Sequence, residues 1–191
     1  MSDLSPASVE PLLRGRLGRP YRFVAVCEST QQLLGQSERE GATVAADLQT
    51  RGRGRLGRRW QAPAGRALLF SVLLRPRLPV PLWPELSLVA GEAVAAALPL
   101  PATVAAPNDV LAGGRKLAGI LPEASDGRVV LGIGVNVNQR ADELPAEAAK
   151  PPTSLRLETG RDWPRGPLLA AILLELEQRY DCWQALHAPL R

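Results

Sequence analysis

The chain has 191 residues, of which 46% are hydrophobic and 22% are charged, so it can bury the core of one substantial domain. No apolar stretch approaches the roughly 20 residues that cross a membrane, and the N-terminus lacks the basic start and apolar core of a secretory signal. Two cysteines far apart in sequence exclude a disulfide framework, and a single histidine, His187, argues against a histidine-based triad or metal site. We therefore expect a cytoplasmic protein.

The net charge of +4 is carried by arginine, because the chain has only two lysines, Lys116 and Lys150. A basic balance suits anionic partners such as nucleotides, phosphates or nucleic acid. Since lysine is so scarce, a lysine inside a motif is more informative here than usual.

The first half of the chain predicts alternating strands and helices. Ser29 and Thr30 have hydroxyl groups that can cap a helix through Arg39. The segment Ala67–Leu74 is apolar along most of its length, which predicts a central strand. The other elements expected here are a short helix before Gly18, the strands Tyr21–Cys27 and Thr43–Gln49, and a helix at Leu82–Leu98.

The second half predicts hairpins and a closing helix. Gly113-Gly114 and Asp126-Gly127 suit tight turns, because glycine accepts positive φ. Ala141–Pro152 is expected to be a loop, and Pro167–Leu186 has the apolar spacing of an amphipathic helix. Hairpins argue against a purely parallel sheet, so we expect one α/β domain with a mixed sheet. The strands expected here are Asn108–Ala112, Arg115–Glu123 and Arg128–Val137.

The segment Arg51–Trp60, with the sequence RGRGRLGRRW, alternates arginine with glycine. Its glycines let the backbone approach a ligand closely, so that successive amide groups can surround a phosphate. Neighbouring guanidinium groups would neutralise and orient that anion. The alternative is a flexible basic loop that binds nucleic acid or nothing.

The segment RKLAGILPE (Arg115–Glu123) combines a lysine with a glycine on a predicted strand. In a regular strand Lys116 shares a face with Ala118, whereas Gly119 lies on the opposite face. Lys116 could place a positive charge on a reacting carboxylate or phosphate oxygen, and Gly119 leaves room for a ligand on the sheet. A solvated surface lysine is the alternative. Pro122 removes a ladder donor, so we place it at an edge or a bulge.

Two further segments carry polar groups on predicted strands. Asn108 and Asp109 open a strand, where they could bind a magnesium ion or a ribose hydroxyl, or could merely cap the strand. In GIGVNVN (Gly132–Asn138), glycine and asparagine alternate with aliphatic residues. One face could therefore form a floor under a bound molecule, and a half-exposed strand is the alternative.

Together these segments resemble one family. GRGRLGRRW, PNDV, RKLAGILPE and GIGVNVN are similar, in this order, to the signature segments of the catalytic domain of biotin–protein ligases. The resemblance includes EST, AADLQ and TSL, and it covers roughly residues 21–187. It implies an α/β (α+β) fold, a mixed β-sheet with flanking helices like that of class II aminoacyl-tRNA synthetases. The implied activity forms biotinyl-5′-adenylate from biotin and ATP with Mg²⁺, then transfers biotin to a lysine of a biotin carboxyl carrier protein.

The resemblance also implies a domain organisation. Residues 1–20 would be an N-terminal extension, and residues 21–187 the catalytic domain. The extension is too short for the helix-turn-helix domain of many bacterial relatives, so no DNA binding is expected. We expect no complete C-terminal SH3-like domain and no membrane partner. Relatives often pair through a sheet edge, which suggests a homodimer.

The family's biotin-binding positions match several residues of this chain. The arginine-rich loop would close over biotin and the activated intermediate, and Gly119 would pack against biotin. Arg55 and Lys116 would be the catalytic residues, with Lys116 on the carboxylate and α-phosphate. The matching biotin positions are Ser29, Thr30, Gln49, Gly52, Arg53, Gly54, Arg55, Lys116 and Gly119.

The family's nucleotide-binding positions also match. Arg55 and Arg58 would hold carboxylate or phosphate oxygens, and Asp109 would lie close to the metal as a Mg²⁺ ligand. The matching ATP and adenylate positions are Arg55, Arg58, Trp60, Asn108, Asp109, Lys116 and Asn136.

The chain departs from the family before its Pro-Asn-Asp segment. Relatives commonly have Lys-Trp where this chain has Ala105-Ala106. The change removes a positive charge and a large packing surface at the edge of the site. It predicts either weakened catalysis or compensation elsewhere.

Three other functions remain open. A lipoate–protein ligase would share the fold, but its glycine-rich RRxxGGG segment is missing from this sequence. A nucleic-acid-binding module could use the arginine-rich loop, but the chain has only eight aromatic residues and no pattern that would stack bases. A catalytically weak or silent biotin-binding homologue would fit Ala105 and Ala106.

Overall fold

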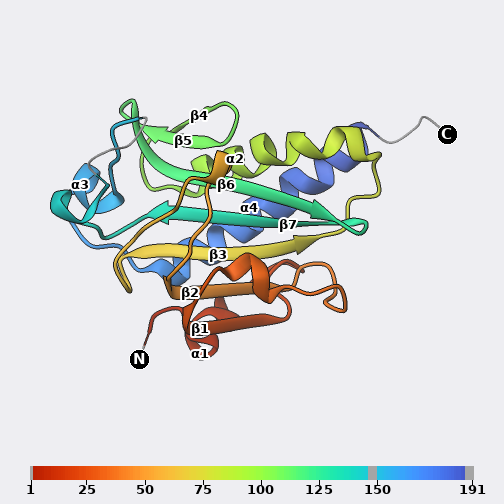
Figure 1. Ribbon diagram of the computed structural model, residues 1–191, viewed down its shortest axis with the longest axis horizontal. Coiled ribbons are helices and arrows are strands. Elements are labelled where there is room, and N and C mark those ends of the chain that lie inside the picture. Colours follow the sequence, from red (N-terminus) through yellow and green to blue (C-terminus); the bar gives the residue numbers. More distant parts are fainter. Residues whose placement is uncertain (1, 146–149, 188–191) are drawn as a thin grey trace.

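The computed structural model describes residues 2–145 and 150–187, and their strands form one mixed sheet (Figure 1). The sheet order is β1-β2-β3-β7-β6-β5-β4. β1 pairs with β2 in parallel and every other pairing is antiparallel, which confirms the predicted mixed sheet. The strands are β1 (Tyr21–Cys27), β2 (Thr43–Gln49), β3 (Ala67–Leu74), β4 (Thr103–Ala105), β5 (Asp109–Ala112), β6 (Arg115–Ser125) and β7 (Arg128–Asn136).

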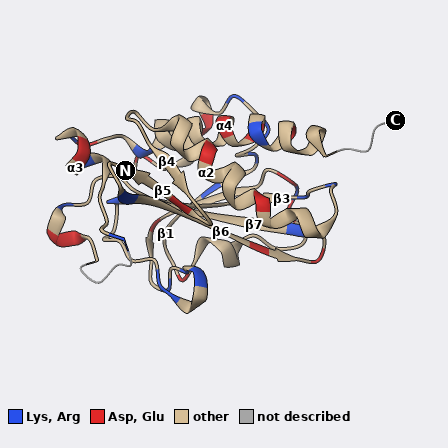
Figure 2. Cartoon of the chain, turned by 90° about the horizontal axis from the view of Figure 1, so that it is seen from above, with Lys and Arg blue, Asp and Glu red and all other residues tan. Residues whose placement is uncertain are grey.

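The two long helices, α2 and α4, lie together on one side of this sheet (Figures 1 and 2). No helix within the described residues is both long and apolar enough to cross a membrane. The α-helices are α1 (Pro6–Val9), α2 (Leu86–Ala97), α3 (Leu155–Thr159) and α4 (Arg165–Leu186). The 3₁₀ turns are η1 (Glu10–Leu12), η2 (Thr30–Leu33), η3 (Arg55–Gly57), η4 (Val80–Glu85) and η5 (Ala141–Glu143).

Strand β3 is central, as predicted, and all of its residues are buried. Val72 belongs to the main core with Leu173 of α4, whereas Leu73 belongs to a smaller cluster with Leu34 and Val130. Neighbouring residues of a strand point to opposite faces, so both faces of β3 are covered. Burial on both faces explains its unbroken apolar sequence.

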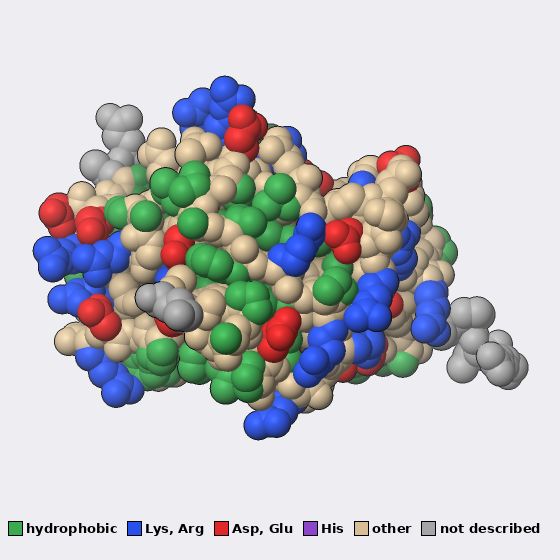
Figure 3. Space-filling model, turned by 90° about the horizontal axis from the view of Figure 1, so that it is seen from below, with side chains coloured by type: hydrophobic (Ala, Val, Ile, Leu, Met, Phe, Trp, Pro, Cys, Tyr) green, Lys and Arg blue, Asp and Glu red, His purple; other side chains and the backbone are tan. Residues whose placement is uncertain are grey.

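Strand β1 lies at the opposite edge of the sheet from β4 and pairs only with β2. Val26 is 58% exposed on this edge, and the Arg22 guanidinium forms an ion pair with Glu38 at 2.9 Å. From the β1 side, the surface shows apolar side chains in the middle and basic side chains toward both ends (Figure 3). The β1 edge is therefore accessible to solvent.

The helix predicted from Ser29 through Arg39 is wrong, because only the single 3₁₀ turn η2 forms there. Neither hydroxyl caps a helix. The Thr30 amide and hydroxyl instead donate to the Gln49 side-chain oxygen at 2.7 and 3.0 Å. These tertiary bonds hold η2 against β2 and replace the caps that a helix would need.

Two short elements, β4 and α3, were not predicted. A three-residue strand and a five-residue helix are too short for periodicity to reveal. The helix predicted at Leu82–Leu98 begins later, at Leu86, because η4 precedes it. The predicted loop Ala141–Pro152 contains η5, and its residues 146–149 lie outside the described residues.

The segment before Tyr21 packs into the same core as the sheet, through Leu4, Val9, Leu13 and Leu17. Arg165, at the start of α4, ties it there. The Arg165 guanidinium is buried and contacts Asp3 at 2.5 Å and Asp47 of β2 at 2.8 Å. One arginine therefore links the N-terminal segment, the sheet and α4.

Replacing Arg165 with methionine should lower the free energy of unfolding by about 2–3 kcal/mol, because two partly buried carboxylates lose their shared counter-charge. Urea denaturation measures the change. The matched control is Arg156→Met, which breaks an exposed ion pair with Asp162 and should cost less than about 1 kcal/mol. Equal losses in the two variants would refute the linking role of Arg165.

Candidate functional site

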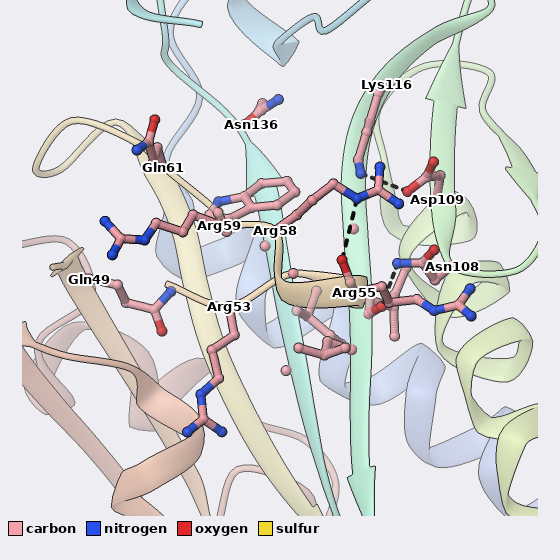
Figure 4. Close-up of a pocket in the computed structure, with 18 of the residues that line it drawn as sticks. Gln49, Arg53, Arg55, Arg58, Arg59, Gln61, Asn108, Asp109, Lys116 and Asn136 are labelled. Atoms are coloured by element: carbon pink, nitrogen blue, oxygen red, sulfur yellow. Dashed lines mark hydrogen bonds and ion pairs between the residues drawn. The ribbon is translucent and has the colours of Figure 1, made fainter. Parts of the chain in front are cut away.

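A cavity of about 530 Å³ lies between the loop Arg51–Gln61 and the sheet (Figure 4). Strands β6 and β7 contribute Gly119, Gly132 and Gly134, which leave the backbone bare. Six cationic side chains and one carboxylate, Asp109, line the cavity, so its charge favours an anionic ligand. The cations are Arg53, Arg55, Arg58, Arg59, Lys116 and Lys150.

The arginine-rich loop folds back on itself. The Gly54 amide donates to the Arg58 carbonyl at 2.7 Å, and the Trp60 amide donates to the Gly52 carbonyl at 3.0 Å. At the tip, Leu56 has a φ of 58° and is 85% exposed. A positive φ is costly for leucine, so the tip stores local strain of the kind found in ligand-binding loops.

An ion pair joins this loop to β6. The Arg53 guanidinium contacts the Glu123 carboxylate at 2.8 and 3.0 Å, and both side chains are about two-fifths exposed. A half-exposed pair contributes little to global stability, but it fixes the local position of the loop.

Trp60 lies directly against the bare backbone of β6 and β7. A Cβ atom at Gly119 would lie 2.8 Å from the indole ring, and one at Gly134 would lie 2.6 Å from it. The Trp60 Nε1 is buried and has no hydrogen-bond partner within the described part of the chain. Buried polar groups are normally satisfied, so this donor points to a ligand or water in the cavity.

Lys116 also reaches this cavity, which corrects the predicted alternation along β6. The register between β5 and β6 shifts, so that Leu111 pairs with Lys116 while Val110 pairs with Ala118. This β-bulge turns Lys116 to the same face as Gly119, because the extra residue breaks the period of two. Lys116 lies with its Nζ 5.7 Å from the Trp60 ring centroid.

Pro122, in contrast, lies at a local edge, as predicted. β6 pairs with β7 at Pro122, whereas β5 pairs with β6 only as far as Gly119. The Ile120 amide faces the β5 side, where it donates to Asn108. Two residues further on, the missing amide of Pro122 therefore faces a side with no strand to bond.

Asp109 connects both lysines of the chain. Its carboxylate lies 2.7 Å from the Lys116 Nζ and 2.9 Å from the Lys150 Nζ. Burial alone would raise the pKa of Asp109, but hydrogen bonds and charge from the two lysines outweigh burial and lower that pKa below its ordinary value. Figure 4 shows Lys116 and Asp109 pointing toward one another from neighbouring strands.

Three cationic side chains of the loop remain available. Within residues 2–145 and 150–187, Arg55, Arg58 and Arg59 form no ion pair with an acidic group; Arg58 Nε donates to the Arg55 carbonyl at 3.3 Å. Unpaired guanidinium groups beside a cavity are suited to bind carboxylate or phosphate oxygens.

Polar groups at the two ends of the cavity are already oriented. At one end, Thr30 occupies the Gln49 oxygen, and within the described residues the Gln49 side-chain nitrogen makes no hydrogen bond and is available to donate. At the other end, the Asn136 oxygen accepts from Gln139 at 2.8 Å, and the Asn136 nitrogen has no partner in the part of the chain that the structure describes. Asn108 instead donates to the Ile120 carbonyl at 3.0 Å, so its side chain extends the β5–β6 ladder.

The cavity brings together most of the residues singled out from the sequence. Ser29 is buried and Gly52 lies at the base of the loop, and neither lines the cavity, contrary to the prediction. Sequence reasoning missed Gln31, Arg59, Gln61 and Lys150, which do line it. The rarity of lysine was the one signal that could have singled out Lys150. The predicted residues that line the cavity are Thr30, Gln49, Arg53, Gly54, Arg55, Arg58, Trp60, Asn108, Asp109, Lys116, Gly119 and Asn136.

The fold and the site define a protein with a cavity lined by cationic side chains, between an arginine-rich loop and three glycines of the sheet. A profile of the Biotin/lipoate A/B protein ligase family matches residues 23–139. The chain belongs to this family.

Among solved structures, biotin protein ligase from Aquifex aeolicus in complex with biotin and ATP is 35% identical, with a TM-score of 0.77 over 85% of this chain and 71% of that one. The bifunctional ligase/repressor BirA of Bacillus spizizenii is 38% identical over 86% of this chain and 54% of its own length. A biotin–[acetyl-CoA-carboxylase] ligase of Mycobacterium tuberculosis is 44% identical over 76% of this chain and 56% of its own length. The chain thus spans about half the length of these two relatives.

Glu123→Gln should release the arginine-rich loop without unfolding the protein, because it removes the charge that holds Arg53. Trypsin cleavage within the loop should accelerate about twofold or more. The free energy of unfolding should change by less than about 1 kcal/mol. Asp162→Asn, which removes an exposed carboxylate outside the loop, is the control and should leave loop cleavage unchanged. Equal cleavage of Glu123→Gln and wild type would refute the anchoring role of Glu123.

Asp109 should make stability depend on pH. Its folded pKa lies below the value of about 3.9 in an unfolded chain, so its ionised form stabilises the folded state above that pH. This contribution is lost as the pH falls through the lower, folded pKa. The stability gap between wild type and Asp109→Asn should therefore be constant at neutral pH and shrink below about pH 4. Urea denaturation across this range measures the gap, and a gap that does not shrink would contradict the ionised pair.

Proposed function

We propose that this chain is the catalytic part of a biotin–protein ligase, which activates biotin with ATP and transfers it to a lysine of a biotin carboxyl carrier protein. The observation that carries the proposal is the convergence of Lys116 and the free loop arginines on a cavity with a glycine floor. The relatives that share this fold, named above, are biotin ligases.

Biotin would lie on the glycine floor under the arginine-rich loop. The Trp60 ring covers Gly119 in this structure, so Gly119 would pack against biotin once that ring shifts. Gln49 would donate to biotin through its side-chain nitrogen. The Thr30 amide and hydroxyl would orient Gln49 toward biotin, because both donate to the Gln49 side-chain oxygen. Loop residues 52–55 would cover the bound molecule and keep water from the activated intermediate.

The nucleotide would occupy the half of the cavity beside Lys116. The biotin carboxylate attacks the α-phosphorus of ATP, the bond to pyrophosphate breaks, and biotinyl-5′-adenylate forms. Lys116, Arg55 and Arg58 would neutralise the oxygens that gain charge in this step, so no nucleophilic side chain is needed. Trp60 and Asn136 would contact the adenosine part of the nucleotide. The acceptor lysine then attacks the acyl carbon and releases AMP.

Magnesium would enter with the nucleotide as MgATP. Asp109 is the one carboxylate among the residues that line the cavity. The described residues contain no group of three or more potential metal ligands. Both oxygens of Asp109 already contact lysine ammonium groups, so magnesium would be held mainly by the substrate phosphates rather than as a resident metal.

The proposal includes a cellular setting. A biotin carboxyl carrier domain would be the protein partner, and the cytoplasm would be the compartment. Neither DNA nor a membrane surface is part of the proposal, and a homodimer would form through a sheet edge.

The proposed function is tested by biotin-dependent exchange of labelled pyrophosphate into ATP with Mg²⁺. Exchange should require biotin and should fall about a hundredfold or more in Lys116→Ala, because the developing charge loses its nearest cation. The matched control is Arg115→Ala, which removes the neighbouring charge outside the cavity and should retain wild-type exchange. If the protein shows no exchange but still binds biotin in calorimetry, the proposal of an enzyme is wrong and the chain is a catalytically silent biotin-binding homologue.

A further inference from the structure

Lys150 lies far from Lys116 in sequence but beside it in space. The Lys116 amide donates to the Pro151 carbonyl at 2.8 Å, and the Thr153 amide donates to the Lys116 carbonyl at 2.9 Å. These bonds form a short parallel bridge between Lys116 and Pro152. The bridge places Lys150 near the start of β6, where its ammonium group contacts Asp109.

The Asp109 carboxylate needs only one positive charge to be neutralised, and it contacts two lysines. Lys116 already provides one counter-charge at 2.7 Å, and Lys150 adds another at 2.9 Å. The cavity also contains four arginines, so Lys150 adds to the repulsion among like charges. An ammonium group has three donors, and Asp109 uses one of those of Lys150. This arrangement leaves positive charge and hydrogen-bond donors available to an anion.

We propose that Lys150 is a second phosphate-binding lysine of the cavity, held next to Lys116 by Asp109 and in contact with phosphate oxygens of bound ATP. The proposal deepens the proposed function and rests on it for the identity of the nucleotide. Asp109 then acts as a positioning residue that keeps both ammonium groups at the same end of the cavity.

The strand pairing offers a direct test of this role. Ala105 of β4 is the cross-strand partner of Asp109, so its side chain lies on the same face. A lysine at position 105 would extend along Asp109 and could supply the charge that Lys150 provides. Ala105→Lys is therefore a rescue variant whose position is independent of the segment around Lys150.

The experiment is calorimetric titration of α,β-methylene ATP, which the proposed reaction cannot cleave, in the presence of saturating biotin. Lys150→Met should weaken nucleotide binding about tenfold or more, because a charge-assisted contact is lost. The nucleotide affinity of Lys150→Arg should remain within about threefold of wild type. Adding Ala105→Lys to Lys150→Met should recover most of the lost nucleotide affinity. The affinity for biotin alone should change by less than about twofold.

Several outcomes overturn the proposal. If Lys150→Met binds the nucleotide analogue as tightly as wild type does, Lys150 makes no phosphate contact. The proposal is also excluded if the wild-type protein does not bind the analogue. An equal loss of biotin and nucleotide affinity would show a merely structural lysine. The readout needs no catalysis, so a protein that fails pyrophosphate exchange but binds the analogue through Lys150 would lose the proposed function and retain the phosphate site.

Discussion

The contact between Trp60 and the bare backbone at Gly119 and Gly134 governs the site. Either glycine, if replaced, would place a Cβ atom within 2.8 Å of the indole ring. The ring therefore reaches the sheet only because two neighbouring strands lack side chains at this level. Trp60 ends the arginine-rich loop, so this contact also sets where the loop arginines stand over the cavity. Together with the Arg53–Glu123 ion pair, this contact holds the basic loop over the cavity.

The sheet supports this arrangement from behind. Helices α2 and α4 cover one face, so the main hydrophobic core forms there, and the arginine-rich loop lies over β6 and β7 on the other face (Figure 2). The β-bulge in β6 then brings Lys116 to the open face, beside Gly119. A regular strand would have pointed its ammonium group toward the core, where a charge is costly. The bulge thus allows a buried strand to carry a lysine whose ammonium group stays out of the core.

The charged groups at Asp109 also come from separate parts of the chain. The resemblance to biotin–protein ligases implies a lysine where this chain has Ala105, and Ala105 is the cross-strand neighbour of Asp109. Lys150 approaches the same carboxylate from another part of the chain. The departure from the family pattern and the unexpected lysine therefore meet at one aspartate. Lys150 is therefore a specific candidate for the residue that compensates for the missing lysine at position 105.

The sequence by itself determined the strands β1, β2 and β3, the hairpins and the family, because alternation, glycine turns and the spacing of the signature segments are local properties. It also singled out Arg55, Lys116 and Asp109. Only the tertiary structure decided which face Lys116 occupies, since a bulge depends on how two strands pair. It alone brought Lys150 to Asp109, because that contact depends on a bridge between segments more than thirty residues apart in sequence.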